Sequence, residues 1–101
     1  MLFIGMNEES DIRYAIIKPL IDGGQIKSFN DIFKMIPKSV VAGDLGKNKA
    51  RFSDLLADIE GFTIKELFMI AKLCHLTESE ILQLAHAEYL KQKGGIENNN
   101  K

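Results

Sequence analysis

Residues 38–55 read KSVVAGDLGKNKARFSDL and predict two short helices joined by a tight turn. Two helices that cross at a steep angle need a small side chain where their backbones approach, and Ala42 provides one. Four residues later the turn needs a residue that tolerates a positive φ, and Gly46 meets that need. The residues that would face a core are Val41, Leu45, Phe52 and Leu55. The segment therefore predicts a helix-turn-helix over about residues 38–55.

The second helix of this segment is expected to expose a polar face. Asn48 suits the N-cap position, because its side chain can accept a hydrogen bond from the first turn. The residues left on the outer face are Asn48, Lys49, Ala50, Ser53, Asp54 and Ala57. The helix is expected to run to about Glu60 and to stop at Gly61.

The sequence before residue 38 predicts a helical lead-in. Asn7 is expected to cap a first helix that ends at Gly23-Gly24, and Pro19 should kink that helix or shorten it by about one turn. Its apolar residues at helical spacing are Ile12, Ile16, Ile17, Leu20 and Ile21. Ser28 with Asp31 resembles a capping box that opens a short helix over residues 29–36. The residues that this short helix should bury are Phe29, Ile32, Phe33 and Ile36. Pro37 suits the first position of the next helix.

Two further capping boxes follow residue 61. Thr63 with Glu66 opens one helix, and Thr77 with Glu80 opens the last, which should run to roughly Lys91. The expected buried stripe of the first of these is Ile64, Leu67, Phe68, Ala71 and Cys74. The sequence thus predicts an all-α fold, a compact bundle of five or six short helices. One domain is expected over residues 1–93, with a flexible tail over residues 94–101.

Residues 37–85 resemble the Cro/cI-type helix-turn-helix repressors, also called the xenobiotic-response-element-like family. Beyond the motif, residues 62–85, FTIKELFMIAKLCHLTESEILQLA, share the capped pair of helices that follows the family's recognition helix. The chain departs from the family in the lysine at position 47, in the acids of the second helix (Asp54, Asp58 and Glu60), and in its longer lead-in. The resemblance implies a lambda-repressor-like fold.

The resemblance also implies that the second helix enters the major groove with its N-terminal residues at base edges. The candidates for base contacts are then Asn48, Lys49, Ala50, Ser53 and Asp54. The candidates for phosphate contacts are Lys38, Lys47 and Arg51.

The distribution of charge agrees with a partner that carries phosphate. The whole chain has a net charge of −1, but residues 34–51 contain five cations and one anion, a local charge of +4. A phosphate backbone responds to the local face of a protein rather than to its total charge. A run of lysines is also an ordinary solvated surface, so this pattern alone does not select a function.

The sequence features indicate neither an exported protein nor an enzyme. The single cysteine fits a reducing compartment, and residues 1–6 are too short and lack the basic start of a signal peptide, so the expected location is cytoplasmic, without a membrane span. Cys74, His75 and His86 do not have the spacing of a zinc site. Cys74 is expected to be an inert core thiol, and Asp54 with Asp58 a solvated pair. No catalytic residue, metal or cofactor is therefore expected.

The function predicted from these features is sequence-specific binding of double-stranded DNA by a transcriptional regulator. The alternative is a non-catalytic protein-interaction module, antitoxin- or adaptor-like, that keeps the fold. The last helix has apolar residues on more than one side, which suggests a homodimer through it: Ile81, Leu82, Leu84, Ala85, Tyr89 and Leu90. The position of Asp54 and Asp58 relative to Lys49 should discriminate between the two functions.

Overall fold

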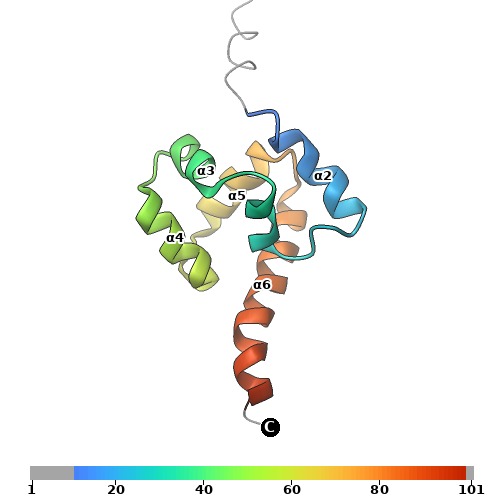
Figure 1. The fold of residues 1–101 in the computed structure, drawn as a ribbon, viewed down its shortest axis with the longest axis vertical. Coiled ribbons are helices and arrows are strands. Elements are labelled where there is room, and N and C mark those ends of the chain that lie inside the picture. Colours follow the sequence, from blue (N-terminus) through green and yellow to red (C-terminus); the bar gives the residue numbers. More distant parts are fainter. Residues whose placement is uncertain (1–10, 100–101) are drawn as a thin grey trace, which may run out of the picture.

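The computed structural model describes residues 11–99, with side chains through residue 94, and confirms an all-α fold (Figure 1). Within the described part the elements are α2 (Tyr14–Asp22), η1 (Phe29–Lys34), α3 (Lys38–Asp44), α4 (Lys49–Ala57), η2 (Ile59–Gly61), α5 (Ile64–Leu73) and α6 (Glu78–Asn99), where η denotes a 3-10 helix. The expected cap at Asn7 and the apolar residues 1–6 lie outside the described residues. The shorter helices gather around the first half of α6, and its second half projects beyond them (Figure 1).

Four phenylalanine rings form a closed cluster at the centre of the core. The ring centroids are 5.5 Å apart for Phe29 and Phe33, 5.5 Å for Phe33 and Phe52, 5.7 Å for Phe52 and Phe62, and 5.2 Å for Phe62 and Phe29. Most of the pairs are edge-on, the arrangement that the ring quadrupoles favour. The cluster joins η1, α4 and the residue that precedes the cap of α5, so it holds α4 against the rest of the chain.

Helix α2 packs through fewer of its isoleucines than the sequence predicted. Ile17 is fully buried, but Ile12 is 84% exposed and Ile16 is 42% exposed. The prediction failed for Ile12 because the helix begins only at Tyr14, and for Ile16 because it lies beside the buried face rather than on it. Pro19 does not shorten the helix, which continues to Asp22.

Tyr14 connects α2 to the end of α3. Its side chain is 1% exposed, and its hydroxyl donates to Asp44 Oδ2 at 2.6 Å. Burial and the neighbouring carboxylate raise the pKa of Tyr14 above its ordinary value. Asp44 is the one anion among residues 34–51, and this hydrogen bond gives it a structural role.

The ends of α4 and α6 also differ from the expected ones. Helix α4 ends at Ala57 rather than Glu60, because side chains from two other elements take its last backbone groups. Leu56 O accepts from Asn30 Nδ2 at 3.0 Å and from Gln92 Nε2 at 3.2 Å, and Ile59 N donates to Gln92 Oε1 at 3.1 Å.

Helix α6 continues past Lys91 to Asn99, because glycine weakens a helix without the steric block that proline imposes.

Both capping boxes after residue 61 form as predicted. Thr63 N donates to Glu66 Oε1 at 2.8 Å and Glu66 N to Thr63 Oγ1 at 3.1 Å, and Thr77 and Glu80 repeat the pair at the same two distances. The buried residues of α5 and its C-cap are Leu67, Ile70, Ala71 and Cys74. Ile64 is 55% exposed, contrary to the predicted stripe, because it is the first residue of α5 and precedes the turn that reaches the core.

Candidate nucleic-acid interface

The turn between α3 and α4 has the backbone geometry that its glycine predicted. Gly46 has a φ of +71°, Gly46 N donates to Gly43 O at 3.1 Å, and Lys47 N donates to Ala42 O at 2.8 Å. These two bonds form a Schellman motif, which closes a helix on a left-handed residue. Ala42 is 1% exposed, and α3 packs against α4. The turn therefore fixes where α4 begins relative to α3.

Gly46→Ala is expected to lower the free energy of unfolding by about 1–2 kcal/mol. No atom lies within 4 Å of the place where a Cβ would stand, so the cost comes from the positive φ alone. Gly43→Ala is the matched control, because its Cβ would also meet no atom within 4 Å and the residue lies in helix α3. The control should raise stability by about 0.5–1 kcal/mol. Chemical denaturation measures both, and a parent-like Gly46→Ala would contradict the role assigned to this turn.

Asn48 caps α4, as predicted. Its Oδ1 accepts from Arg51 N at 3.1 Å, and its side chain is exposed. The amide oxygen is therefore already in use, and the amide nitrogen is the group left to donate outward. A bidentate contact with adenine needs both groups, so this residue would have to give up the cap to make one.

Lys47 lies in an ion pair within the protein. Its Nζ is 2.5 Å from Glu66 Oε2, and the two side chains are only 27% and 12% exposed. Burial raises the pKa of Glu66, but the hydrogen bonds from Lys47 and the Thr63 backbone outweigh it and hold that pKa below its ordinary value. The pair ties the turn to the start of α5. This residue is thus less available to phosphate than Lys38 and Arg51, the other two candidates.

Glu66→Gln is expected to cost about 1 kcal/mol of stability at pH 7 and nothing in acid. Glutamine keeps the capping geometry at this position but removes the charge that faces Lys47. Because the folded pKa of Glu66 is lowered, its stabilisation is present above the ordinary value of 4.5 and is lost as the pH falls through the folded value. Urea unfolding of parent and variant between pH 7 and pH 3 measures the difference. A difference that stays constant with pH would contradict the ion pair.

The outer face of α4 has Asp54 near its centre. The helix buries Phe52, Leu55 and Leu56. At about 100° per residue, Ala50, Asp54 and Ala57 follow one another on the opposite side. Lys49 and Ser53 lie on the flank next to Leu56, and Arg51 lies on the other flank. The five predicted base contacts are therefore divided among the cap, the outer face and one flank.

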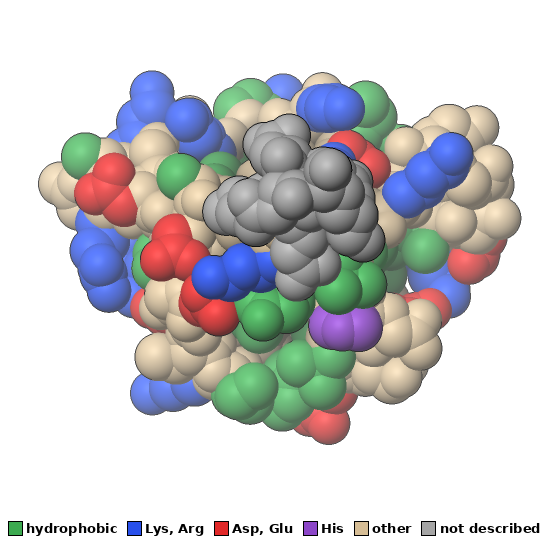
Figure 2. Space-filling model, turned by 90° about the horizontal axis from the view of Figure 1, so that it is seen from below, with side chains coloured by type: hydrophobic (Ala, Val, Ile, Leu, Met, Phe, Trp, Pro, Cys, Tyr) green, Lys and Arg blue, Asp and Glu red, His purple; other side chains and the backbone are tan. Residues whose placement is uncertain are grey.

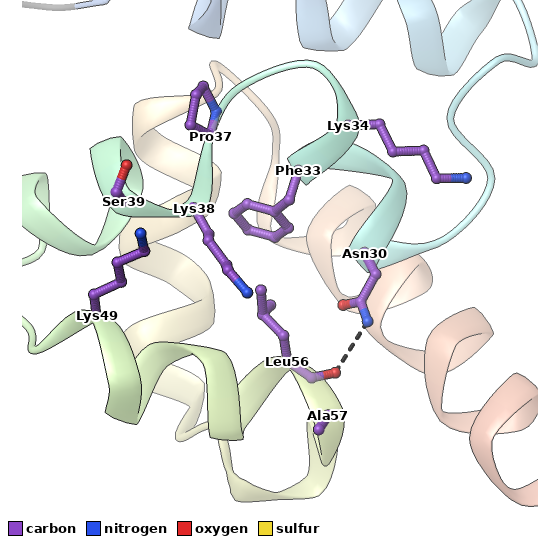
Figure 3. A pocket seen from close by; sticks show the side chains of 9 residues that line it. All are labelled: Asn30, Phe33, Lys34, Pro37, Lys38, Ser39, Lys49, Leu56 and Ala57. Atoms are coloured by element: carbon purple, nitrogen blue, oxygen red, sulfur yellow. Dashed lines mark hydrogen bonds between the residues drawn. The ribbon is translucent and has the colours of Figure 1, made fainter.

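Lys38 and Lys49 both line a groove between η1, α3 and α4. In Figure 3, Lys38 reaches into the groove from the start of α3 and Lys49 from the start of α4, with the Phe33 ring beside Lys38 on the side away from Lys49. Lys34 also lines the groove, but its ammonium group points away and lies 3.3 Å from Asp31. Among the residues that the structure describes, no carboxylate lies within ion-pairing distance of Lys38, Lys49 or Arg51.

The other polar groups singled out in the sequence do not assemble into a site. Cys74 is fully buried, and burial raises its pKa to about 12. His75 is exposed at a positive φ of 61° in the turn after α5, and the His86 ring stacks on Tyr89. Within residues 11–94 no three potential metal-ligating side chains come together. The described helices include none with the length and hydropathy to cross a bilayer.

Sequence patterns missed several residues around the groove. Asn30, Phe33 and Ser39 line it beside the lysines. The sequence predicted Phe33 only as a buried residue of the short helix over residues 29–36, and it did not single out Asn30; the packing of η1 against the end of α4 brings both here. Comparisons with protein-family models, curated proteins and solved structures find no match to this chain. They therefore do not support the resemblance to Cro/cI-type repressors, which stays a prediction from residues 37–85.

Proposed function

We propose that the chain binds double-stranded DNA through a helix-turn-helix formed by α3 and α4, as a sequence-specific transcriptional regulator. The observation that carries the proposal is the setting of α4: a capped helix, exposed on its outer side, with cations on both flanks that make no ion pair with a described residue. Lys38 and Lys49 border one flank and Arg51 the other. A helix in the major groove has a phosphate backbone on each side, so cations on both flanks suit that position.

The geometry suggests a revised division of contacts. Ala50 and Asp54, at the centre of the outer face, would meet bases, the first at a thymine methyl and the second at a cytosine amino group. Asn48 would donate from its amide nitrogen, and Ser53 would reach bases from the flank. Lys49 shares its groove with Lys38, so it is as well placed for a phosphate as for a base.

The position of Asp54 leads to a specific prediction about which DNA sequences bind. It stands away from Lys49 and makes no ion pair with a described residue, so the positive charge is confined to the flanks of α4. Acidic side chains accompany the basic ones on the same side of the molecule, at the left of Figure 2. An unpaired carboxylate near phosphate costs affinity unless a base amino group meets it. We therefore propose weak binding to random DNA and a requirement for cytosine at one position of the preferred site.

Selection from random duplex DNA, followed by titration of the selected site at several salt concentrations, tests this function. The selected site should bind more tightly than random sequence, with a salt slope that reports several phosphate contacts. Asp54→Asn should strengthen binding to random DNA and relax the choice of one base pair, which Asp58→Asn, beyond the end of α4, should not do. If no duplex binds even at low salt, DNA binding is excluded.

A second candidate function, docking to a protein, has one observation in its favour. Leu82 is 38% exposed and Leu90 51% exposed, and they lie on one side of α6 with His86 between them. Figure 2, which looks along the molecule from the C-terminal end of α6, shows exposed hydrophobic side chains near a histidine. The occupant that best fits the DNA-binding proposal is a second copy, because a two-fold dimer presents two copies of α4.

Leu90→Glu is expected to shift a dimer to monomer at micromolar concentration, because it places a charge in the contact between two copies of α6. Light scattering or sedimentation measures the mass. Ile12→Glu is the control, since Ile12 is 84% exposed and lies before α2. A parent that is already monomeric would exclude the dimer and with it a palindromic site.

A further inference from the structure

The groove that contains Lys38 and Lys49 is large enough for a small organic molecule. Its volume is about 560 Å³, within the range of ligand sites in proteins. It opens between η1, the first turn of α3 and the whole length of α4, so three elements contribute to its walls (Figure 3). A phosphate group from a DNA backbone would fill only a small part of it.

The walls of the groove combine positive charge with apolar surface. Phe33, Pro37 and Leu56 provide the apolar part, and Ser39 provides a hydroxyl group. The two ammonium groups have no carboxylate partner among the described residues, and neither Asp nor Glu lines the groove. A bare inorganic anion would leave the apolar walls in contact with water, and a neutral apolar molecule would leave both charges unmatched.

We propose that this groove binds a small organic anion with an apolar body, such as an aromatic or branched aliphatic carboxylate, and that the bound anion displaces DNA. The carboxylate lies between the ammonium groups of Lys38 and Lys49, and the apolar body lies against Phe33 and Leu56. The displacement rests on the proposed function, because the anion occupies the same two cations that would otherwise hold phosphate. The binding itself does not depend on it.

A second groove offers an internal comparison. It has a volume of about 320 Å³ and lies between the end of α3 and α5, lined by Asp44, Leu45, Met69, Lys72, Leu73 and His75. It also combines apolar and charged side chains, but Asp44 places a carboxylate in its wall. An organic anion should therefore prefer the first groove, and Lys72 provides a control for lysines in general.

Fluorescence titration with 1-anilinonaphthalene-8-sulfonate, an aromatic anion that brightens in apolar surroundings, tests the site. The double variant Lys38→Met/Lys49→Met keeps most of the length of both side chains and removes their charge. It should bind the dye at least tenfold more weakly than the parent, although methionine makes the groove more apolar. Lys72→Met should bind like the parent. Equal binding by the parent and the double variant would overturn the proposal.

Competition defines the ligand class and separates the two proposals. Benzoate should displace the dye, and inorganic phosphate at the same ionic strength should not; equal displacement by phosphate would show a bare anion site and overturn the ligand class. Benzoate should also release labelled duplex from the parent. If the dye binds in the lysine-dependent way but no duplex binds, the groove stands and the DNA-binding function fails. If duplex binds but benzoate does not release it, displacement is overturned.

Discussion

Phe52→Ala is expected to lower the free energy of unfolding by about 3–5 kcal/mol, a large part of the total for a domain of this size. Phe52 is fully buried, and its ring contacts both Phe33 and Phe62, so its removal opens the four-membered aromatic cluster. The cavity would lie between α4 and the core. The helix cannot easily move in to fill it, because Asn30 and Gln92 hold the end of that helix. Urea denaturation followed by circular dichroism measures the change.

Two variants distinguish the contribution of the aromatic cluster to stability from that of ordinary hydrophobic burial. Phe52→Leu should cost about 1–1.5 kcal/mol, because it keeps much of the buried area and loses the edge-on contacts. Phe68→Ala, at a partly buried phenylalanine of α5 outside the cluster, should cost less than Phe52→Ala. If Phe52→Ala costs no more than Phe68→Ala, the cluster does not hold α4 in place.

Lys38→Glu/Lys49→Glu is expected to weaken DNA binding at least about 30-fold at 0.15 M salt. Each phosphate contact contributes about 0.9 to the slope of log affinity against log salt, which corresponds to about fivefold in affinity at that concentration. Two lost contacts account for most of the change, and the repulsion of two introduced carboxylates adds to it. The slope itself should fall by about two. Fluorescence anisotropy of a labelled duplex, at four salt concentrations, provides both quantities.

The matched control for this pair is Lys65→Glu/Lys72→Glu. It makes the same change in net charge with two exposed lysines of α5. Both double variants should melt close to the parent, since the lysines concerned make no ion pair with a described residue. If the control loses as much affinity as Lys38→Glu/Lys49→Glu, the interaction depends on total charge and the interface assigned to α4 is wrong.

The sequence by itself determined the elements that depend on neighbours along the chain. Thr63 and Thr77 mark helix starts because the partner of each capping bond lies three residues away. Gly46 marks the turn because its positive φ is a property of one residue. Asn48 marks the start of α4 in the same way as the two threonines, because its capping partner, Arg51 N, also lies three residues away. Such local bonds need no knowledge of the fold, which is why the all-α class and the position of α4 were predictable.

The tertiary structure alone decided what depends on partners distant in sequence. In the sequence, Lys47 is one more cation of a basic run. In the structure it forms an ion pair with Glu66 of α5. Helix α4 ends early because Asn30 and Gln92 both donate to Leu56 O, in its last turn. The groove of Lys38 and Lys49 exists because η1 packs beside α4. Periodicity gives the side of a helix on which a residue lies, but the charges and hydrogen-bonding groups that meet it there are set by how the helices pack.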